Sequence, residues 1–382
     1  MSVDNNKKYT EDRLEAQARR KRKNNISSIL VMFGCLIVLV LVTYVAGVLY
    51  MWIDDEFQKN ANDLAAAAEA AERENMVTYT QEELDARIAE AVQKASEEAK
   101  KAAKTEVLAG MKESLAGGDV TMVEVLRPLY EEELVVASEG KFHFVPIQNN
   151  LKKNTYQQEN LNILENGEYQ YLENGQVVSY KGIDVSKFQG EIDWKKVAED
   201  GVEFAFIRVG NRGYGSEGTL IEDSMFEKNI EGALQAGIKV GVYIYSQAIT
   251  EEEVLEEANF VLEKIAPYKV ECPVVFDVEK VSDSKGRMNA LSVEERTNIT
   301  LLFCQTIEAA GYKPMIYHNL EMGALMLDLE TLENYDKWFA YYNEDLYYPY
   351  DYKIWQYSHR GRVNGIEGDV DMNISFVPLW EE

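Results

Sequence analysis

The sequence predicts an α/β protein whose second half folds as an irregular TIM-like barrel. From Lys181 onward, strand-like runs alternate with helical runs, as in a barrel of parallel strands. The last three strand-like runs lie too close together for full helices between them, so we expect an irregular barrel. The expected strands are Ile183–Val185, Phe204–Val209, Val240–Tyr245, Val274–Val278, Pro314–Tyr317, Trp338–Tyr341, Lys353–Gln356 and Val370–Ile374. The expected helices are Asp223–Gln235, Glu251–Ile265 and Val293–Ala310.

The composition limits the classes of function. The chain has 382 residues, which is room for two or three domains. Its 39 basic and 66 acidic residues give a net charge of -27, so nucleic-acid phosphates repel it and we expect no nucleic-acid partner. The three Cys and three His residues are scattered along the sequence, and we expect no disulfide framework, no metal and no cofactor.

A long uncharged run near the N-terminus predicts a membrane anchor. The thirty residues Asn24–Ile53 carry no charge, and about 20 apolar helical residues cross a bilayer. The run follows the basic cluster Arg19–Lys23, and basic residues stay in the cytoplasm. We therefore expect a cytoplasmic tail over 1–25 and an uncleaved transmembrane helix over 26–53. A cleaved signal peptide is the rival, but its apolar core is shorter and ends in small residues.

Residues 54–118 are expected to form a helical stalk. Ala, Glu, Lys and Gln dominate this segment, and Thr80 with Glu83 matches a capping box. The apolar seam is mostly Ala and is interrupted by Glu98, so a robust coiled coil is not supported. Self-association or an envelope-complex partner through the stalk stays open. Because residues 55–115 hold no cluster typical of a site, we expect a fragment from about residue 160 onward to keep full activity.

Residues 119–180 are expected to form a small mixed domain with a β-meander. Asn166-Gly167 and Asn174-Gly175 each lie between short apolar or aromatic runs. Asn-Gly is typical of type I′ hairpin turns, so two of them predict three antiparallel strands. The meander is either a binding module or a packing cap on the barrel. We favour the cap, because hairpins alone carry no chemistry.

Polar residues at the expected strand ends indicate the chemistry, because active sites of such barrels lie there. Asp184 ends the first strand, Asp277 and Glu279 end the fourth, and Asp371 lies in the eighth. Residues i and i+2 of a strand share a face, with Cα atoms about 6.6 Å apart. Two carboxyls that close raise one pKa, which supplies a general acid for glycoside cleavage. A solvated loop or a cation site is the alternative, because Asp-x-Glu alone is common.

Aromatic residues strengthen the glycoside interpretation. The chain has 23 Tyr and five Trp residues, and several lie at expected strand ends, where their faces can stack on sugar rings. They are Tyr243, Tyr245, Tyr317, Tyr341, Trp355 and Tyr357.

Taken in order, these motifs resemble the family 25 glycoside hydrolases, the N,O-diacetylmuramidase type of lysozyme. The resemblance covers about residues 181–376, and the ordered set is more specific than any one motif. The motifs are Gly182–Ser186 with Phe188–Gly190, Phe204–Arg208, Pro273–Glu279, Met315–Tyr317, Trp338–Ala340, Trp355–Tyr357 and Asp369–Asp371. One departure is Tyr243-Ile244-Tyr245, since many members have His after the Tyr of this strand.

The resemblance implies a (β/α)5(β)3 barrel over 181–382 that cleaves the β-1,4 bond between N-acetylmuramic acid and N-acetylglucosamine. It implies that Glu279 is the general acid. Asp277 would orient or stabilise the acetamido group or the intermediate. Asp184 is the third catalytic candidate. The substrate-binding candidates are Asp371, Arg208, Tyr243, Tyr317, Trp355 and Tyr357.

The hypothesis is thus a membrane-anchored peptidoglycan hydrolase for wall remodelling or penetration. It would sit in a bacterial cell membrane by a single pass, with the catalytic domain outside. A non-catalytic wall-binding or assembly module is one alternative, but the intact carboxylates argue against it. A hydrolase of another N-acetylated glycan, such as chitin, is the other, and the anchor does not separate these substrates.

We predict that residues 26–53 form an uncleaved helix with the N-terminus in the cytoplasm. Protease added outside intact protoplasts should then remove the part of the chain after residue 54, because the basic cluster Arg19–Lys23 stays inside. Immunoblotting of the residual tail measures this. A secreted protein that begins near residue 50 would contradict the anchor.

Overall fold

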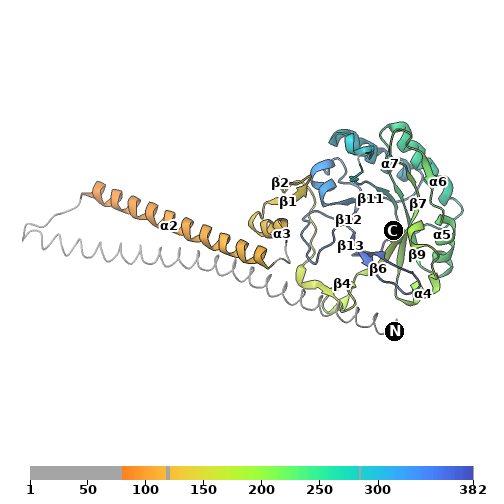
Figure 1. Cartoon of the computed structure of the whole chain (residues 1–382), viewed down its shortest axis with the longest axis horizontal. Coiled ribbons are helices and arrows are strands. Elements are labelled where there is room, and N and C mark those ends of the chain that lie inside the picture. Colours follow the sequence, from red (N-terminus) through yellow and green to blue (C-terminus); the bar gives the residue numbers. More distant parts are fainter. Residues whose placement is uncertain (1–79, 118–120, 284, 382) are drawn as a thin grey trace, which may run out of the picture. The chain divides into compact units, whose positions relative to one another are not determined.

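The computed structural model describes residues 80–117, 121–283 and 285–381 (Figure 1). The predicted tail 1–25, the predicted transmembrane helix 26–53 and the first part of the stalk lie outside the described residues. Among the helices that are described, none is long and apolar enough to cross a membrane. The chain divides into two compact units, one ending at Leu129 and one beginning at Tyr130.

The described part of the first unit contains one long helix. α2 spans Gln81–Ala116, and the capping box predicted at its start is confirmed: the Glu83 carboxylate accepts from the Thr80 amide at 2.8 Å. Its 36 residues extend about 54 Å at 1.5 Å per residue. Apolar side chains on α2, such as Val92 and Leu108, are exposed, so the helix has no buried seam of its own. α3 (Met122–Leu126) and the 3-10 helix η1 (Arg127–Leu129) follow.

The second unit is built on a closed barrel of eight strands, as the sequence predicts. Seven strands run parallel, and the last, β14, is antiparallel to both of its neighbours, β13 and β6. A short strand, β8 (Leu220–Glu222), pairs with the end of β7. In sequence order the barrel strands are β6 (Tyr180–Val185), β7 (Phe204–Arg212), β9 (Lys239–Tyr245), β10 (Val274–Asp277), β11 (Pro314–Asn319), β12 (Asp336–Ala340), β13 (Ile354–Gly361) and β14 (Val370–Ser375).

Helices follow the first five barrel strands, and the last three strands have none between them in the described chain, which gives the (β/α)5(β)3 order. Figure 1 shows the longer helices around the outside of the strands. The six-residue α4 was not predicted, because it is too short to show a helical period. The five are α4 (Trp194–Glu199), α5 (Phe226–Gln235), α6 (Glu251–Ile265), α7 (Val293–Ala309) and the π-helix η5 (Met322–Met326). Short 3-10 helices are η2 (Gln158–Asn160), η3 (Lys187–Gln189) and η4 (Met288–Ala290).

Aromatic rings fill the barrel interior toward the amino ends of the strands. The ring of Phe206 stacks on Trp338 with a centroid separation of 4.7 Å, and Phe204 packs edge-on against Phe206. A Cβ atom at Gly182 would overlap the Phe204 ring, and one at Gly241 would overlap the Phe206 ring. Glycine is therefore required at both positions, and the open space lies at the carboxyl ends of the strands.

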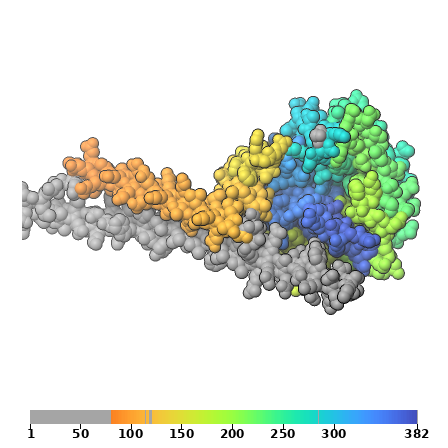
Figure 2. Space-filling model, viewed as in Figure 1, coloured from red at the N-terminus to blue at the C-terminus, as the bar shows by residue number. Residues whose placement is uncertain are grey.

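Two small β elements pack on the barrel. The meander is confirmed as β3 (Leu161–Ile163), β4 (Tyr169–Glu173) and β5 (Gln176–Val177), and positive φ angles at Asn174 and Gly175 fit the predicted I′ turn. A hairpin of β1 (Glu133–Ser138) and β2 (Lys141–Pro146) precedes it. The hairpin, yellow in Figure 2, lies against the blue part of the barrel unit.

Residues before 160 belong to the barrel's core. The sequence analysis expected a fragment from about residue 160 onward to keep full activity, but such a fragment would lack part of this core. Leu134, Val136 and Leu151 are at most 5% exposed and join the main core cluster. The Val135 amide also donates to the Tyr347 hydroxyl at 2.7 Å. Composition alone could not show this, because the hairpin is short and lies far in sequence from its partners.

We predict that a fragment beginning at Tyr130 folds cooperatively, whereas one beginning at residue 160 is less stable by about 5 kcal/mol or more. The shorter fragment loses three buried aliphatic side chains, each contributing about 1.5–3 kcal/mol. Urea unfolding of both fragments followed by circular dichroism measures the difference. Equal midpoints would show that the hairpin does not stabilise the barrel.

Candidate active site

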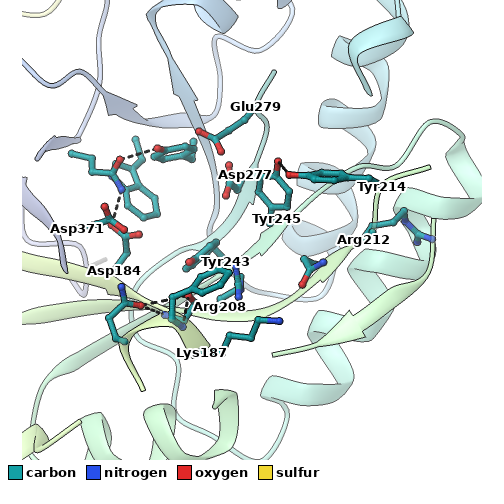
Figure 3. A pocket seen from close by; sticks show the side chains of 18 of the residues that line it. Asp184, Lys187, Arg208, Arg212, Tyr214, Tyr243, Tyr245, Asp277, Glu279 and Asp371 are labelled. Atoms are coloured by element: carbon teal, nitrogen blue, oxygen red, sulfur yellow. Dashed lines mark hydrogen bonds between the residues drawn. The ribbon is translucent and has the colours of Figure 1, made fainter. Parts of the chain in front are cut away.

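The carboxyl ends of the barrel strands open into a cavity of about 510 Å³ (Figure 3). Three groups of side chains share it: carboxylates, cations and aromatic rings. The carboxylates are Asp184, Asp277, Glu279 and Asp371, and the cations are Lys187, Arg208 and Arg212. The aromatic residues are Phe188, Tyr214, Tyr243, Tyr245, Tyr317, Trp338 and Tyr342. The arrangement combines acid groups with surfaces suited to sugar rings.

Asp277 and Glu279 enter the cavity from the end of β10. Asp277 lies in register with Tyr245 and Tyr317 on the neighbouring strands. It is 7% exposed, and its Oδ1 has no hydrogen-bond partner among the described residues. Glu279 is only partly buried, and Figure 3 shows both side chains pointing into the cavity from the same side. The pair thus combines a deep carboxyl with one that substrate can reach.

The pKa values of this pair favour protonation. Burial raises the pKa of Asp277 well above its usual range, and the charge of Glu279 raises it further. Burial also raises the pKa of Glu279 to about 7, with a contribution from the charge of Asp184. A carboxyl with a pKa near 7 can hold a proton and donate it at neutral pH. Glu279, which solvent reaches, is therefore the better placed general acid.

Asp184 is held at the end of β6 by two amide side chains. Its Oδ2 accepts from Gln356 Nε2 at 2.7 Å and from Asn373 Nδ2 at 2.8 Å. Burial raises the pKa of Asp184 to about 6, while these two hydrogen bonds oppose the rise. Asp184 is therefore mostly ionised at neutral pH, and both donors face one carboxylate oxygen.

A second layer of hydrogen bonds fixes the two amides. The Gln356 amide oxygen accepts from the hydroxyls of Tyr317 and Tyr342, at 2.8 Å and 2.6 Å. The Asn373 amide oxygen accepts from Trp338 Nε1 at 2.8 Å. Because each amide oxygen is already occupied, each NH2 group must face Asp184. Tyr317, expected to bind substrate, thus lines the cavity mainly as a support for this network.

Asp371 lies directly opposite Asp184 on the antiparallel pair β14–β6. Burial raises the pKa of Asp371 to about 8, and the charge of Asp184 adds to the rise. Two carboxyls at such a position share a charge, because the ionisation of one disfavours the ionisation of the other. The hydrogen bonds that Asp184 accepts from Gln356 and Asn373 favour the charge on Asp184, and burial favours the proton on Asp371.

Arg208 and Tyr243 lie in register on β7 and β9 and both line the cavity. Arg208 pairs with Asp223, its Nη2 lying 2.6 Å from the carboxylate. Asp223 was expected to begin the first of the three predicted helices of the barrel, but α5 begins at Phe226. The Asp223 carboxylate instead accepts from Arg208 and from the backbone amides of Lys187 and Met225.

The structure corrects two candidates. Trp355 and Tyr357 were expected to bind substrate, but they do not line the cavity. Side chains alternate along β13, so Gln356 points inward and its two aromatic neighbours point outward. Trp355 Nε1 donates to the Tyr341 carbonyl at 2.7 Å, and Tyr357 stacks on Tyr169 of the meander at 4.1 Å.

Several residues of the site, either lining the cavity or supporting its carboxylates, were missed by the sequence reasoning. Strand alternation could have found Asn373, two residues after Asp371, and could have placed Gln356 inward. Tyr214 comes from the loop between β7 and β8, and its hydroxyl lies 3.0 Å from that of Tyr245. No local signal in the sequence places that loop beside β9.

The hairpin reaches the segment that follows β10. The ammonium group of Lys280, adjacent to Glu279, lies 2.8 Å from a carboxylate oxygen of Glu139 and 2.8 Å from one of Glu321. Glu139 lies in the hairpin turn, and Glu321 immediately precedes η5. Lys280 thus joins the hairpin and η5 to the backbone that carries Glu279.

The described residues contain no cluster of three His, Cys, Asp or Glu side chains placed as metal ligands. Cys272 and Cys304 are buried free thiols.

The fold and the cavity define a barrel enzyme with a carboxyl-based site, and comparison with known proteins gives its family. The model of "Glycosyl hydrolases family 25" matches residues 183–366. The uncharacterized protein YegX of Escherichia coli K12 is 30% identical over 50% of this chain and 68% of its own length. The autolytic lysozyme of Clostridium acetobutylicum is 28% identical, over 50% of this chain and 55% of the lysozyme. The chain belongs to glycoside hydrolase family 25.

Solved structures include a family 25 glycosyl hydrolase from Bacillus anthracis. It is 25% identical to this chain, with a TM-score of 0.43, and the match covers 52% of this chain and 89% of that one. By its family, the chain is a glycoside hydrolase.

We predict that Glu279→Gln raises the free energy of unfolding above that of wild type by about 2 kcal/mol at pH 8. At pH 4 the gain should be much smaller. The folded-state pKa of about 7 lies above the ordinary value of 4.5, so the native state keeps a proton that the unfolded chain releases. Wild-type stability therefore falls as the pH rises from about 4.5 to about 7, and the amide removes this loss.

Urea unfolding at both pH values measures the effect. Glu367→Gln, at an exposed position, is the matched control and should show no such pH-dependent gain. Equal stabilities of Glu279→Gln and wild type at pH 8 would show that the fold does not raise this pKa.

Proposed function

We propose that the chain is a muramidase, which hydrolyses the β-1,4 bond between N-acetylmuramic acid and N-acetylglucosamine in peptidoglycan. The observation that carries the proposal is one cavity that holds both Glu279, whose pKa burial raises to about 7, and Asp184, which accepts hydrogen bonds from Gln356 and Asn373. Family membership supports it, as do the relatives described as lysozymes, from Clostridium acetobutylicum and Streptomyces globisporus. The chain spans only 55% and 66% of those two lysozymes.

In the proposed mechanism, Glu279 protonates the leaving oxygen of the glycosidic bond. Its raised pKa keeps the proton available, and its partial exposure lets the substrate reach it. Positive charge then develops on the sugar carbon in an oxocarbenium-like transition state. The ionised Asp184, fixed by Gln356 and Asn373, supplies negative charge that is already oriented when this positive charge forms.

Asp277 has a different proposed role. It is too deeply buried to be the first proton donor, and its unpartnered Oδ1 is available to a substrate group. We assign it to the acetamido group of the substrate or to the intermediate that follows bond cleavage. Tyr245 and Tyr214, whose hydroxyls lie together at the cavity, supply an aromatic surface for a sugar ring.

The proposed location is the outer face of a bacterial cell membrane. The support is the sequence alone: the uncharged run 26–53 and the basic cluster before it. A helical stalk would then carry the barrel away from the bilayer toward the wall. In this setting the enzyme would remodel the wall or open it locally rather than act as a free lytic protein.

We predict that Glu279→Gln lowers the rate of peptidoglycan cleavage about 10²–10⁴-fold, the usual contribution of general acid catalysis. The amide keeps the shape of the side chain but has no acidic proton for the leaving oxygen. Wild-type kcat/KM should also fall as the pH rises above about 7, because Glu279 then loses its proton. Asp277→Asn should be slow too, through weaker stabilisation of the intermediate.

The measurement is digestion of purified peptidoglycan, with mass spectrometry of the new reducing ends. Glu367→Gln, which changes a carboxylate outside the cavity, should keep wild-type turnover. N-acetylmuramic acid at the new reducing ends supports the assignment, whereas cleavage of chitin alone would indicate another N-acetylated glycan. Wild-type turnover by a folded Glu279→Gln variant would remove the assigned role of Glu279.

A further inference from the structure

A short turn at the rim of the cavity presents two neighbouring exposed side chains. The turn is η3 (Lys187–Gln189), which we call the rim turn, and it follows β6 and the anchored Asp184. Phe188 is 76% exposed although it lines the cavity, and Lys187 beside it is exposed too. A large aromatic ring open to water at the wall of a site is available to a ligand.

The backbone of the rim turn is held firmly. The Ser186 hydroxyl accepts from the Phe188 amide, and the Gln189 side-chain oxygen accepts from the Ser186 amide at 2.9 Å. The Lys187 amide donates to the Asp223 carboxylate at 3.1 Å, the same carboxylate that pairs with Arg208. The exposed side chains therefore extend from a fixed backbone, which reduces the entropy that a ligand must remove.

Lys187 differs from the other two cations of the cavity. Arg208 is paired with Asp223, and Arg212 lies 2.7 Å from Glu257. Lys187 forms no ion pair with any described carboxylate, and its ammonium group lies 5.6 Å from the centre of the Phe188 ring. Figure 3 draws Lys187 well apart from Glu279. The cavity thus offers one cation that is free to meet a ligand's negative charge.

The proposed substrate carries such a charge. In peptidoglycan the lactyl group of N-acetylmuramic acid bears a short peptide that ends in a carboxylate. Chitin has neither the lactyl group nor the peptide, and peptide-free glycan keeps only the lactyl group, whose carboxylate lies close to the sugar ring rather than at the end of a peptide. A chain of net charge -27 repels an anionic substrate at long range, so a local cation is needed where the carboxylate docks. A lysine ammonium serves this purpose as a compact point charge.

We propose that Lys187 and Phe188 form a subsite for the peptide-bearing sugar, with Phe188 packed on the apolar face of the substrate and Lys187 paired with the peptide carboxylate. This inference rests on the proposed muramidase function and deepens it. The subsite makes the enzyme prefer glycan with stem peptides over glycan without them.

The test compares kcat/KM of the full-length chain on two substrates: peptidoglycan strands with their stem peptides, and the same strands after an amidase has removed them. Lys187→Met should lower the ratio of the two kcat/KM values about 5-fold, the order expected for one partly solvated charge pair. The wild-type ratio should fall with added salt, and the ratio for Lys187→Met should change little. Lys187→Arg keeps the charge and should keep most of the preference.

Two further variants separate the roles. Phe188→Leu removes the ring but no charge, so it should lower kcat/KM on both substrates and leave the ratio near that of wild type. Lys195→Met removes a cation on α4 outside the cavity and should change neither value.

Two results would overturn the subsite. If Lys187→Met cleaves both substrates normally and its ratio of kcat/KM values equals that of the wild-type enzyme, the charge pair is refuted. The proposed muramidase function is unaffected by this result. A wild-type enzyme that cleaves neither substrate refutes the proposed function, and the subsite falls with it.

Discussion

Four carboxyl groups share one cavity, and this constraint determines most of what surrounds it. Ionised carboxyls at such close quarters repel one another, and burial disfavours their charge further. Arg208, whose charge opposes the rise in the pKa of Asp184 and Asp277, is already paired with Asp223. The charge is instead concentrated on Asp184, and burial favours protons on Asp277, Glu279 and Asp371. The separation of roles between a proton donor and a fixed negative charge follows from this distribution.

The distribution depends on the closing strand. β14 runs antiparallel to both neighbours and brings Asp371 opposite Asp184, while Asn373 donates to Asp184 from two residues further on. Gln356 donates from the adjacent β13, and aromatic hydroxyl and indole groups fix both amides. These supports come from four consecutive strands, β11 to β14, whereas Asp184 lies on β6, far from them in sequence. A site of this kind is stable only when the barrel is closed, so the fold and the pKa values of the site are coupled.

The period of two along strands explains what could be predicted from the sequence. It placed Asp277 and Glu279 on one face, and the spacing of strands and helices indicated an irregular eight-stranded barrel. The same rule predicts that Trp355 and Tyr357 point away from the barrel interior if Gln356 points into it. They were expected to bind substrate because aromatic rings can stack on sugars. The position of Tyr214 at the cavity and the contact of Lys280 with the hairpin could not be predicted from the sequence, because loop positions depend on long-range packing. The capping box at Thr80 and the type I′ turn at Asn174-Gly175 were predicted because their signals are local. Asn166-Gly167 also lies between two strands, but Asn166 does not have the positive φ angle that a type I′ turn requires.

The bounds of the family match have a consequence for exchanging catalytic modules between wall enzymes. The match covers residues 183–366, so it begins inside β6 and ends before β14. A chimera cut at these positions would lack half of the first strand and the whole strand that carries Asp371 and Asn373. It would present the unpaired edges of β13 and of the remaining half of β6 to solvent, and open edges of this kind recruit other chains. Such a graft would aggregate, whatever linker joined it, unless the transferred piece extended from the hairpin to the C-terminal side of β14.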